Sequence, residues 1–404
     1  MTDQMTFRLA WRNLWRRPRR TLLTLSALVL TLAMLIFFGN LMSGMWDRII
    51  RVATSSLVGQ AQVHLAEYRR TQDPERFLRD RDALISALER QPQVKGASAR
   101  IYAPALAAMG DRSQSVRLMG VDPEREAMVT SWKDRIWQGR YLTDDGGALI
   151  GKRLAEKLEI GVDSKLVVTV ADLRTGDLNS VLLRVHGILW TQNPKVDEGS
   201  VIVTLPTAEK LAGLQNAAHE VALTWHTTGE VPPTTPSLPR DDLVFSTWQE
   251  LIPGMAQAYN LQSGYLWFSF VVVFLLVALS IANTMNMSLM ERHREFGILM
   301  ALGTSDRQLV GGIVSEYFLL GGLGSVAGLV LGLLITLACA QTGITLTGVE
   351  VMGFALDEPL YPRTDLAFSF GQALTFWVLT PLISYWSVNR LRRMDPVEIL
   401  QASM

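Results

Sequence analysis

Four long runs that are free or nearly free of charged residues constrain this chain more than any other feature of its sequence. The first is Thr21 to Trp46, about 26 residues dense in Leu, Ala, Phe and Met. The second is the apolar stretch 264–290, the third runs from Gln308 to Cys339 with Glu316 as its one ionisable residue, and the fourth is Leu366 to Asn389. Each run is long enough to cross a hydrocarbon layer of roughly 30 Å as a helix. A buried core helix would explain one such run but not four, so the sequence predicts four transmembrane helices.

The composition agrees with a membrane protein and excludes several other classes. Charged residues make up 19% of the 404 residues and the mean hydropathy is +0.19, whereas soluble chains carry about 25% charged residues. The chain has 38 Lys+Arg and 38 Asp+Glu, so it lacks the basic excess typical of nucleic-acid binding, and we predict no nucleic-acid partner. A single cysteine, Cys339, and five histidines without an HExxH pattern give neither a disulfide nor a recognisable metal site.

Arginine placement predicts how the four helices are oriented. Arginines are concentrated in residues 1–20, 291–307 and 390–404, whereas the short loop 340–365 is mainly acidic. Since cytoplasmic flanks carry the excess of Lys and Arg, both termini and the segment 291–307 are predicted to be cytoplasmic. These segments hold 12 Lys+Arg against 6 Asp+Glu, and the extracytoplasmic parts hold 26 against 31. A cleaved signal peptide is the alternative for the first run, but the run exceeds the usual apolar region of about 7 to 15 residues and no A-x-A site follows.

Residues 47–263 are predicted to form one extracytoplasmic domain of mixed α and β structure, inserted between the first and second helices. β-Branched and aliphatic patches predict strands, and amphipathic patches between them predict helices. The strand patches are Gln62–Leu65, Lys165–Val170, Val181–Val185 and Ser200–Val203, and the helical patches are Pro74–Glu89, Lys152–Leu158 and Thr207–Leu214. The proline-rich stretch 231–239 predicts an exposed loop.

The segment 1–20 is predicted to be a helix at the membrane surface. Phe7, Ala10, Trp11, Leu14 and Trp15 fall on one helical face, and most arginines fall elsewhere. Tryptophan favours headgroup depth and arginine favours anionic lipid, which is typical of an interfacial helix. A plain positively charged flank is the compatible alternative.

One sequence pattern is similar to that of a phosphate-binding loop. Residues 146–153, GGALIGKR, nearly match GxxxxGK[ST], but Arg153 stands where the magnesium-binding hydroxyl is required. The predicted topology also places this pattern away from cytoplasmic ATP, so we interpret it as a turn leading into a short helix. No spacing singles out a catalytic triad or a carboxylate pair, and the chain is predicted not to be an enzyme.

Two features of the helical runs concern packing. Gly324, Gly328 and Gly332 recur every fourth residue, which leaves one face of the third helix open to close approach by another helix, in the same chain or in a second copy. Pro381 is predicted to kink the fourth helix, because its ring removes a backbone hydrogen bond. Glu316 is interpreted as an interfacial residue, with an intramembrane functional charge as the alternative.

The link 291–307 carries the most informative motif. Its charges stand beside an apolar stretch, in the sequence ERHREFGILMALG from Glu291 to Gly303. This motif resembles the ER-x-x-E-[IF]-G and A-L-G signature of the MacB/FtsX/lipoprotein-releasing (LolC/LolE-like) family of ABC-transporter permeases. Weaker matches follow in the family's order along nearly the whole chain, from the arginine-rich start through Gly120–Pro123, Gly139–Leu142 and Val185–Ile188 to the ending Arg392–Leu400.

The resemblance implies a function and a site. It implies that the link is a coupling helix that docks on a separate cytosolic ABC ATPase, so that ATP and Mg bind the partner and this chain binds no cofactor. The coupling residues are then Glu291, Arg292, Arg294, Glu295, Phe296 and Gly297. Family members work as pairs, with a second permease copy or a paralogue, in the bacterial inner membrane.

The resemblance also implies a class of cargo. We expect extraction of lipoproteins from the inner membrane and transfer to a periplasmic carrier. The alternatives are a MacB-like efflux permease for periplasmic peptides or drugs, and an FtsX-like regulator that transports nothing and activates a cell-wall hydrolase.

Overall fold

The four apolar runs form four long helices in the computed structural model, which describes residues 3–71, 73–226, 236–292, 295, 297–299, 302–345, 350–351, 354–355 and 358–391. The helices are α2 (Pro18–Ala53), α10 (Pro253–Glu291), α12 (Asp306–Thr342) and α13 (Leu366–Leu391). Each is long and apolar enough to cross a membrane, as predicted. α2 and α10 begin at prolines, which suit a first helical turn because that turn has no use for their missing N–H.

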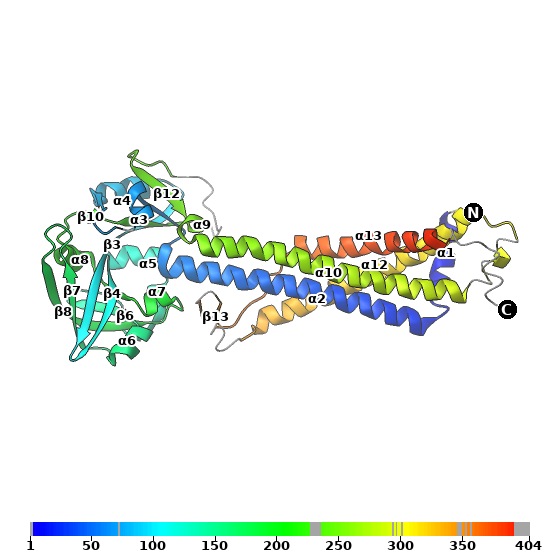
Figure 1. Cartoon of the computed structure of the whole chain (residues 1–404), viewed down its shortest axis with the longest axis horizontal. Helices are drawn as coiled ribbons and strands as arrows, with labels where there is room; N and C mark the ends of the chain where they lie inside the picture. The colour runs from blue at the N-terminus through cyan, green and yellow to red at the C-terminus, as the bar shows by residue number, and fades with distance from the viewer. Residues whose placement is uncertain are drawn as a thin grey trace. The chain divides into compact units, whose positions relative to one another are not determined.

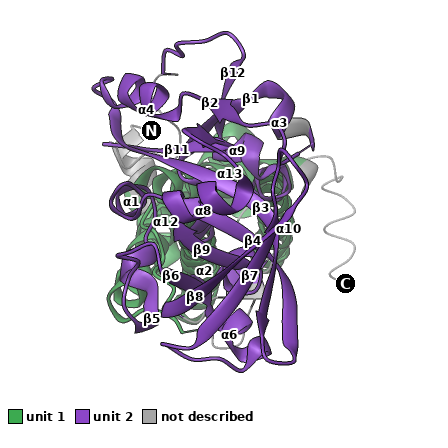
Figure 2. Ribbon diagram, turned by 90° about the vertical axis from the view of Figure 1, so that its left-hand side faces the viewer, with its two compact units in different colours: residues 1–46, 260–345, 359–404 green, residues 47–259, 346–358 purple. Residues whose placement is uncertain are grey.

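The chain divides into two compact units, coloured separately in Figure 2. Unit 1 comprises residues 1–46, 260–345 and 359–404, and unit 2 comprises residues 47–259 and 346–358. The sequence interpretation ended the α+β domain at residue 263 and treated 340–365 as a separate loop. Part of that loop belongs to unit 2, where it contributes the short strands β13 (Glu350–Val351) and β14 (Phe354–Ala355).

Unit 1 is a helical bundle in which parts of α2, α10, α12 and α13 run alongside one another (Figure 1). Its apolar core takes side chains from all four helices, among them Leu32 of α2, Met285 of α10, Leu320 of α12 and Phe376 of α13. Polar groups join the bundle as well. Buried Asn40 of α2 bonds through its amide nitrogen to Ser369 Oγ (3.3 Å) and accepts the Asp365 N–H (3.0 Å) through its amide oxygen. Asn40 is therefore a packing group within one chain.

The glycine series of α12 lies against α2. A Cβ built on Gly324, Gly328 or Gly332 would lie 3.2, 2.9 and 3.0 Å from the Cβ atoms of Leu28, Leu32 and Ile36, respectively. These distances are shorter than nearly all contacts of real Cβ atoms, so the two helices can approach this far only because side chains are missing on one face. The sequence left open whether this face meets the same chain or a second copy; here it meets the same chain.

The N-terminal helix is shorter than the predicted range 1–20, because residues 18–20 already belong to the next helix. Helix α1 covers Asp3–Leu14, and α2 begins four residues later at Pro18. The residues predicted to share one apolar face differ in exposure. Ala10 and Leu14 are buried, and α1 packs on α12. Trp11 and Trp15 are 47% and 43% exposed, with their rings 6.2 Å apart in an edge-to-face pair.

Unit 2 is built on a ten-stranded sheet with the order β12-β1-β11-β3-β4-β9-β6-β8-β5, and β7 pairs with both β3 and β8. The strands are β1 (Ala61–Leu65), β3 (Val94–Met109), β4 (Arg112–Val121), β5 (Ile136–Gly139), β6 (Gly147–Gly151), β7 (Lys165–Ala171), β8 (Leu178–Leu189), β9 (Ser200–Thr204), β11 (Glu220–Trp225) and β12 (Leu243–Thr247). Because β7 bridges β3 and β8, strands β3, β4, β9, β6, β8 and β7 close into a ring. A separate short pair is formed by β2 (Leu78–Arg79) and β10 (Ala217–Ala218).

Short helices complete unit 2 and confirm an α+β fold. They are α3 (Ala66–Thr71), α4 (Arg81–Glu89), α5 (Pro123–Val129), α6 (Lys152–Leu158), α7 (Pro194–Asp197), α8 (Leu205–Ala212), α9 (Trp248–Leu251), the π-helical turn η1 (Thr54–Val58) and the 3-10 turn η2 (Trp132–Arg135). Side chains from α6 and α8 join the apolar core enclosed by the ring, which includes Ile101, Val168 and Val185.

Two local predictions for unit 2 are wrong. The helix predicted over Pro74–Glu89 begins only at Arg81, because residues 78–79 pair with β10 and Asp80 takes a left-handed conformation (φ 57°) that a helix cannot include. The stretch 146–153 was interpreted as a turn leading directly into a short helix. The turn is confined to residues 145–146, the buried strand β6 follows over Gly147–Gly151, and helix α6 then has the predicted bounds. The proline-rich stretch lies mostly outside the described residues, as does the end of the tail 390–404.

A buried charged cluster fixes the π-helical turn to the sheet of unit 2. The Arg100 guanidinium on β3 donates to Glu126 (2.7 Å) and Glu220 (3.2 Å) and to the Leu57 carbonyl of η1. The Arg100 and Glu126 side chains are fully buried, and burial raises the pKa of Glu220. Removing one partner of such a cluster leaves an uncompensated buried charge, so these contacts hold η1 rigidly. Trp132 adds a hydrogen bond from its indole nitrogen to the Ser56 carbonyl (2.8 Å).

The glycine contact in unit 1 gives a first prediction. Gly328→Val should force α12 away from Leu32 and destabilise the protein by about 1 to 3 kcal/mol, the usual penalty for overpacking. The matched control is Gly312→Val on the same helix, where an added Cβ meets no described atom within 4 Å. Thermal unfolding of the detergent-solubilised chain would measure both, and equal midpoints for the two variants would contradict the close packing.

Candidate functional site

Charged residues gather where α10 ends and α2 begins. Glu291, the last residue of α10, forms ion pairs with Arg17 and with Arg20, whose Nη1 lies 3.3 Å from Glu291 Oε2. Glu295 lies 3.8 Å from Arg16 Nη1. Two of the predicted coupling residues are therefore held by the arginine-rich segment at the other end of the sequence.

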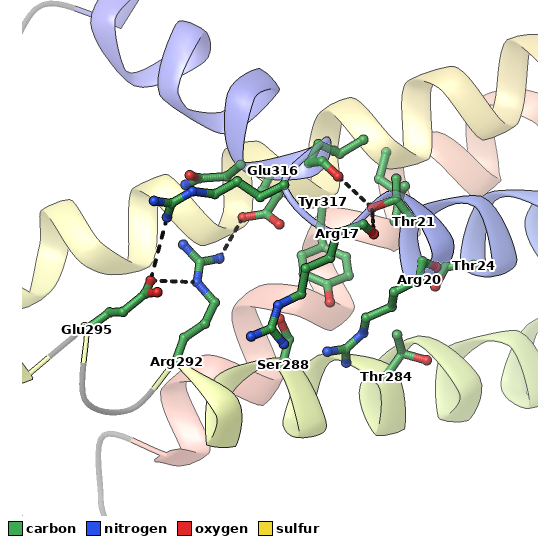
Figure 3. A pocket seen from close by; sticks show the side chains of 14 residues that line it. Arg17, Arg20, Thr21, Thr24, Thr284, Ser288, Arg292, Glu295, Glu316 and Tyr317 are labelled. Atoms are coloured by element: carbon green, nitrogen blue, oxygen red, sulfur yellow. Dashed lines mark hydrogen bonds and ion pairs between the residues drawn. The ribbon is translucent and has the colours of Figure 1, made fainter.

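Arg292 links this group to the third apolar helix. Its Nη1 donates to Glu316 Oε2 of α12 (3.2 Å), and its Nε lies 3.5 Å from Glu295 Oε2 (Figure 3). The Arg292 and Glu316 side chains are each only 19% exposed. The one charged residue within the third run is thus paired with a predicted coupling residue of opposite charge. We call Arg16, Arg17, Arg20, Glu291, Arg292, Glu295 and Glu316 the arginine–glutamate network.

The structure brings together three of the six predicted coupling residues: Glu291, Arg292 and Glu295. Arg294 and Phe296 lie outside the described residues. Gly297 is described and stands apart from the network, since a Cβ added there would meet no atom of the described residues within 4 Å. A larger side chain at Gly297 would therefore not clash with the part of the chain that the structure describes.

The network can transmit movement between helices, because its ion pairs connect them. It connects the segment before α2, the first turn of α2, the end of α10 and the first turns of α12 through five ion pairs described above. Exposed pairs contribute little individually, about 0 to 1 kcal/mol, but the less exposed Arg292–Glu316 pair resists separation more strongly. A displacement applied at Glu291 to Glu295 is therefore passed to three helices together.

The phosphate-loop pattern carries no phosphate site in the structure. Gly151 ends strand β6 against the backbone of Asp197, and Arg153 donates to Glu198 (2.6 Å). Lys152, which a phosphate loop would direct at its ligand, lies over the rings of Trp137 and Trp190 at 4.6 and 5.1 Å. Within the described ranges, no three His, Cys, Asp or Glu side chains gather in a way that could hold a metal ion.

Sequence reasoning missed the role of Arg16, Arg17 and Arg20. It treated them as topogenic charges, and the only signal for pairing was the presence of two acids, Glu291 and Glu295, in a link that also carries arginines. The partners are more than 270 positions apart in the sequence, for example Arg20 and Glu291. No local pattern reveals such a pair.

Two family descriptions match this chain. The MacB-like periplasmic core domain matches residues 21–230, and the FtsX-like permease C-terminal domain matches residues 267–396. The first match covers more than half of the chain. The protein belongs to the MacB/FtsX/LolC family of ABC transporter permeases, and its four apolar helices make it a membrane protein.

Several relatives carry related names. An uncharacterized ABC transporter permease of Methanocaldococcus jannaschii is 27% identical over 224 residues, 52% of this chain and 53% of the relative. The lipoprotein-releasing system transmembrane protein LolC of Xylella fastidiosa is 19% identical over 258 residues, 61% of each chain. The macrolide export ATP-binding/permease protein MacB of Hyphomonas neptunium is 24% identical over 201 residues, 50% of this chain and 27% of the relative. The chain spans less than two thirds of the length of each of these relatives.

Solved structures of isolated domains are also similar. The extracellular domain of YknZ, a noncanonic ABC-type transporter from Gram-positive bacteria, matches 41% of this chain and 83% of its own length, with 18% identity and a TM-score of 0.31. The periplasmic region of MacB from Actinobacillus actinomycetemcomitans matches 49% of this chain and 94% of its own length, with 9% identity and a TM-score of 0.35.

The pairing of Arg292 with Glu316 gives a second prediction. Arg292→Gln should destabilise the helical unit by about 1 to 3 kcal/mol, because it leaves a largely buried carboxylate without its cation. Adding Glu316→Gln to that variant should restore part of the loss, since the unpaired charge is then gone. Thermal unfolding of the single and double variants would measure the coupling, with exposed Arg307→Gln as the control for loss of a positive charge. Strictly additive losses would contradict the pair.

Proposed function

We propose that this chain is the permease subunit of a lipoprotein-releasing ABC transporter, in which ATP hydrolysed on a partner drives extraction of lipoproteins from the inner membrane. The proposed coupling to a partner ATPase is supported by the arginine–glutamate network, which joins the link after α10 to three helices. The cargo rests on the similarity to LolC.

The proposed partner is a cytosolic ABC ATPase that docks on the segment from Glu291 to Gly297. With this segment and both termini on the cytoplasmic side, closure of the ATPase pair would move the link, and the ion pairs would carry that movement into α2 and α12. ATP and Mg would be held by the ATPase. The extracytoplasmic unit 2 would then act as the moving arm.

A second copy or a paralogue is the proposed membrane partner, and the surface of α10 supports it. Asn283 and Asn286 lie three residues apart in the apolar part of α10, and both are exposed in this chain, as are Ser269 and Ser280. Amides facing lipid are unfavourable, so polar residues in membrane helices usually face another helix or a water-filled cavity. Pairing two permeases through this face would cover the amides and create a cavity of mixed polarity.

Efflux of periplasmic peptides or drugs is the second candidate. The observation in its favour is the MacB-like core domain, which matches residues 21–230, together with the similarity to a macrolide export protein. The FtsX-like match over 267–396 keeps open a third candidate, a regulator that activates a cell-wall hydrolase without transporting anything. All three share the coupling mechanism and differ only in what unit 2 acts on.

Coupling is tested at Gly297. Gly297→Leu should lower copurification of the ATPase and the stimulated ATPase rate by about tenfold or more. A bulky side chain would occupy the docking surface, and a Cβ at this position meets no described residue of its own chain within 4 Å. Gly254→Leu is the matched control, because a Cβ there likewise meets nothing within 4 Å among the residues that the structure describes. Unchanged ATPase binding by the Gly297 variant would refute docking at this segment.

Cargo is tested by depletion. In cells depleted of the chain, lipoproteins should accumulate in the inner membrane, and re-expression of the Gly254→Leu variant, but not of Gly297→Leu, should restore their release. Membrane fractionation followed by immunoblotting measures the distribution. Normal lipoprotein sorting with raised macrolide sensitivity would replace the primary candidate with efflux, and normal sorting with defective cell-wall cleavage would replace it with the regulator.

A further inference from the structure

A cavity of about 260 Å³ lies within unit 1 beside the arginine–glutamate network. Its walls come from the end of α1, the first turns of α2, the last turns of α10 and one face of α12. All of Arg17, Arg20 and Arg292 line it, and Figure 3 shows Arg17 and Arg20 extending toward Ser288 and Thr284 of α10, while Arg292 extends toward Glu316. Guanidinium and hydroxyl groups are the donors that proteins use to bind phosphate oxygens.

The charges around the cavity do not cancel. Arg16, Arg17, Arg20 and Arg292 line it together with Glu295 and Glu316, a formal charge of +2. Glu291 pairs with Arg17 and Arg20 from outside the lining and lowers the local charge to +1. The Arg20 Nη2 atom is buried and has no hydrogen-bond partner among the residues that the structure describes. One cationic donor and one positive charge are therefore left for a ligand with a single negative charge.

The cavity lies at the depth of lipid headgroups. Arg20 and Glu291 are the first charges beyond the uncharged runs that begin at Thr21 and end at Met290. Cavity residues thus fall on both sides of the boundary, with Thr24 and Thr284 inside the apolar runs and the arginines outside them. Exposed Trp11 and Trp15 on the adjoining helix α1 mark the same level, because tryptophan favours the membrane interface.

We propose that this cavity binds the phosphodiester headgroup of an anionic phospholipid, with the guanidinium groups of Arg16 and Arg20 as its principal donors. A phosphodiester carries one negative charge and two free acceptor oxygens, which match the residual charge and the unused Arg20 donor. Arg20 and Arg16 also pair with Glu291 and Glu295, respectively. A bound lipid headgroup would therefore restrict the motion of the arginine–glutamate network.

The experiment measures lipid binding by the delipidated full-length chain in detergent, without the ATPase. Native mass spectrometry would follow titration with phosphatidylglycerol, with phosphatidylcholine as the zwitterionic comparison and glycerol 3-phosphate as the free phosphate. Arg20→Gln should weaken phosphatidylglycerol binding about tenfold, since it removes a charge-assisted donor. Arg19→Gln is the matched control: this neighbouring arginine is exposed, does not line the cavity, and its loss changes the net charge equally.

Arg16→Gln keeps the test decisive if the Arg20 variant fails to fold. The Arg16 side chain is 64% exposed and its only described ion pair is the 3.8 Å contact with Glu295, so folding should survive its replacement. Loss of binding in this variant, with binding kept in Arg19→Gln, supports the site. Equal weakening of binding by Arg19→Gln, or equal binding of phosphatidylcholine, would overturn the proposed site. Tighter binding of glycerol 3-phosphate than of phosphatidylglycerol would show that the phosphate does not come from a lipid. None of these outcomes depends on ATPase docking.

Discussion

The pair formed by Arg292 and Glu316 sets the arrangement of the helical unit. A carboxylate within a run of apolar residues is unfavourable unless a cation lies beside it, and the Glu316 oxygen finds one at 3.2 Å. Arg292 can reach Glu316 only if the end of α10 lies against the first turns of α12. Once that end is placed, Glu291 falls beside Arg17 and Arg20, so the start of α2 is drawn to the same point.

Rigidity in the α+β unit has a different origin. The six-stranded ring β3-β4-β9-β6-β8-β7 leaves no free edge among its members, and its interior is filled by small and branched residues such as Ala103, Val168 and Val201. Arg100 then binds the Leu57 carbonyl from the sheet, with Glu126 and Glu220 supplying the opposite charge. Within unit 2, the turn that follows the long helix is thus tied to the sheet at a buried point. A body held in this way moves as a whole rather than deforming, which suits the proposed role of an arm.

The sequence predicted those features that depend on local pattern. Uncharged length indicated the four helices, and a four-residue glycine period indicated the close face that Gly324, Gly328 and Gly332 present to α2. Strand patches such as Lys165–Val170 stood out through β-branched residues. The closed ring of strands could not be predicted in this way, because it depends on β7 pairing with β3 and β8 at once. Arg100 resembled any exposed charge, since its partners Glu126 and Glu220 are 26 and 120 residues away. The proposed coupling segment was identified through a family signature, and the arginines that pair with it were identified only through the fold.

Two features of the helical unit share one physical logic. Asn283 and Asn286 expose amides on an apolar helix, and the cavity beside the network retains an unpartnered Arg20 donor within the part of the chain that the structure describes. In water neither would matter, because solvent would satisfy both. In a membrane each is unfavourable until another molecule supplies the missing acceptor or donor. The amides lie where a second permease would pack, and the arginine lies where a headgroup would sit. Both proposals therefore follow from the same requirement, that polar groups withdrawn from water must find partners in the membrane.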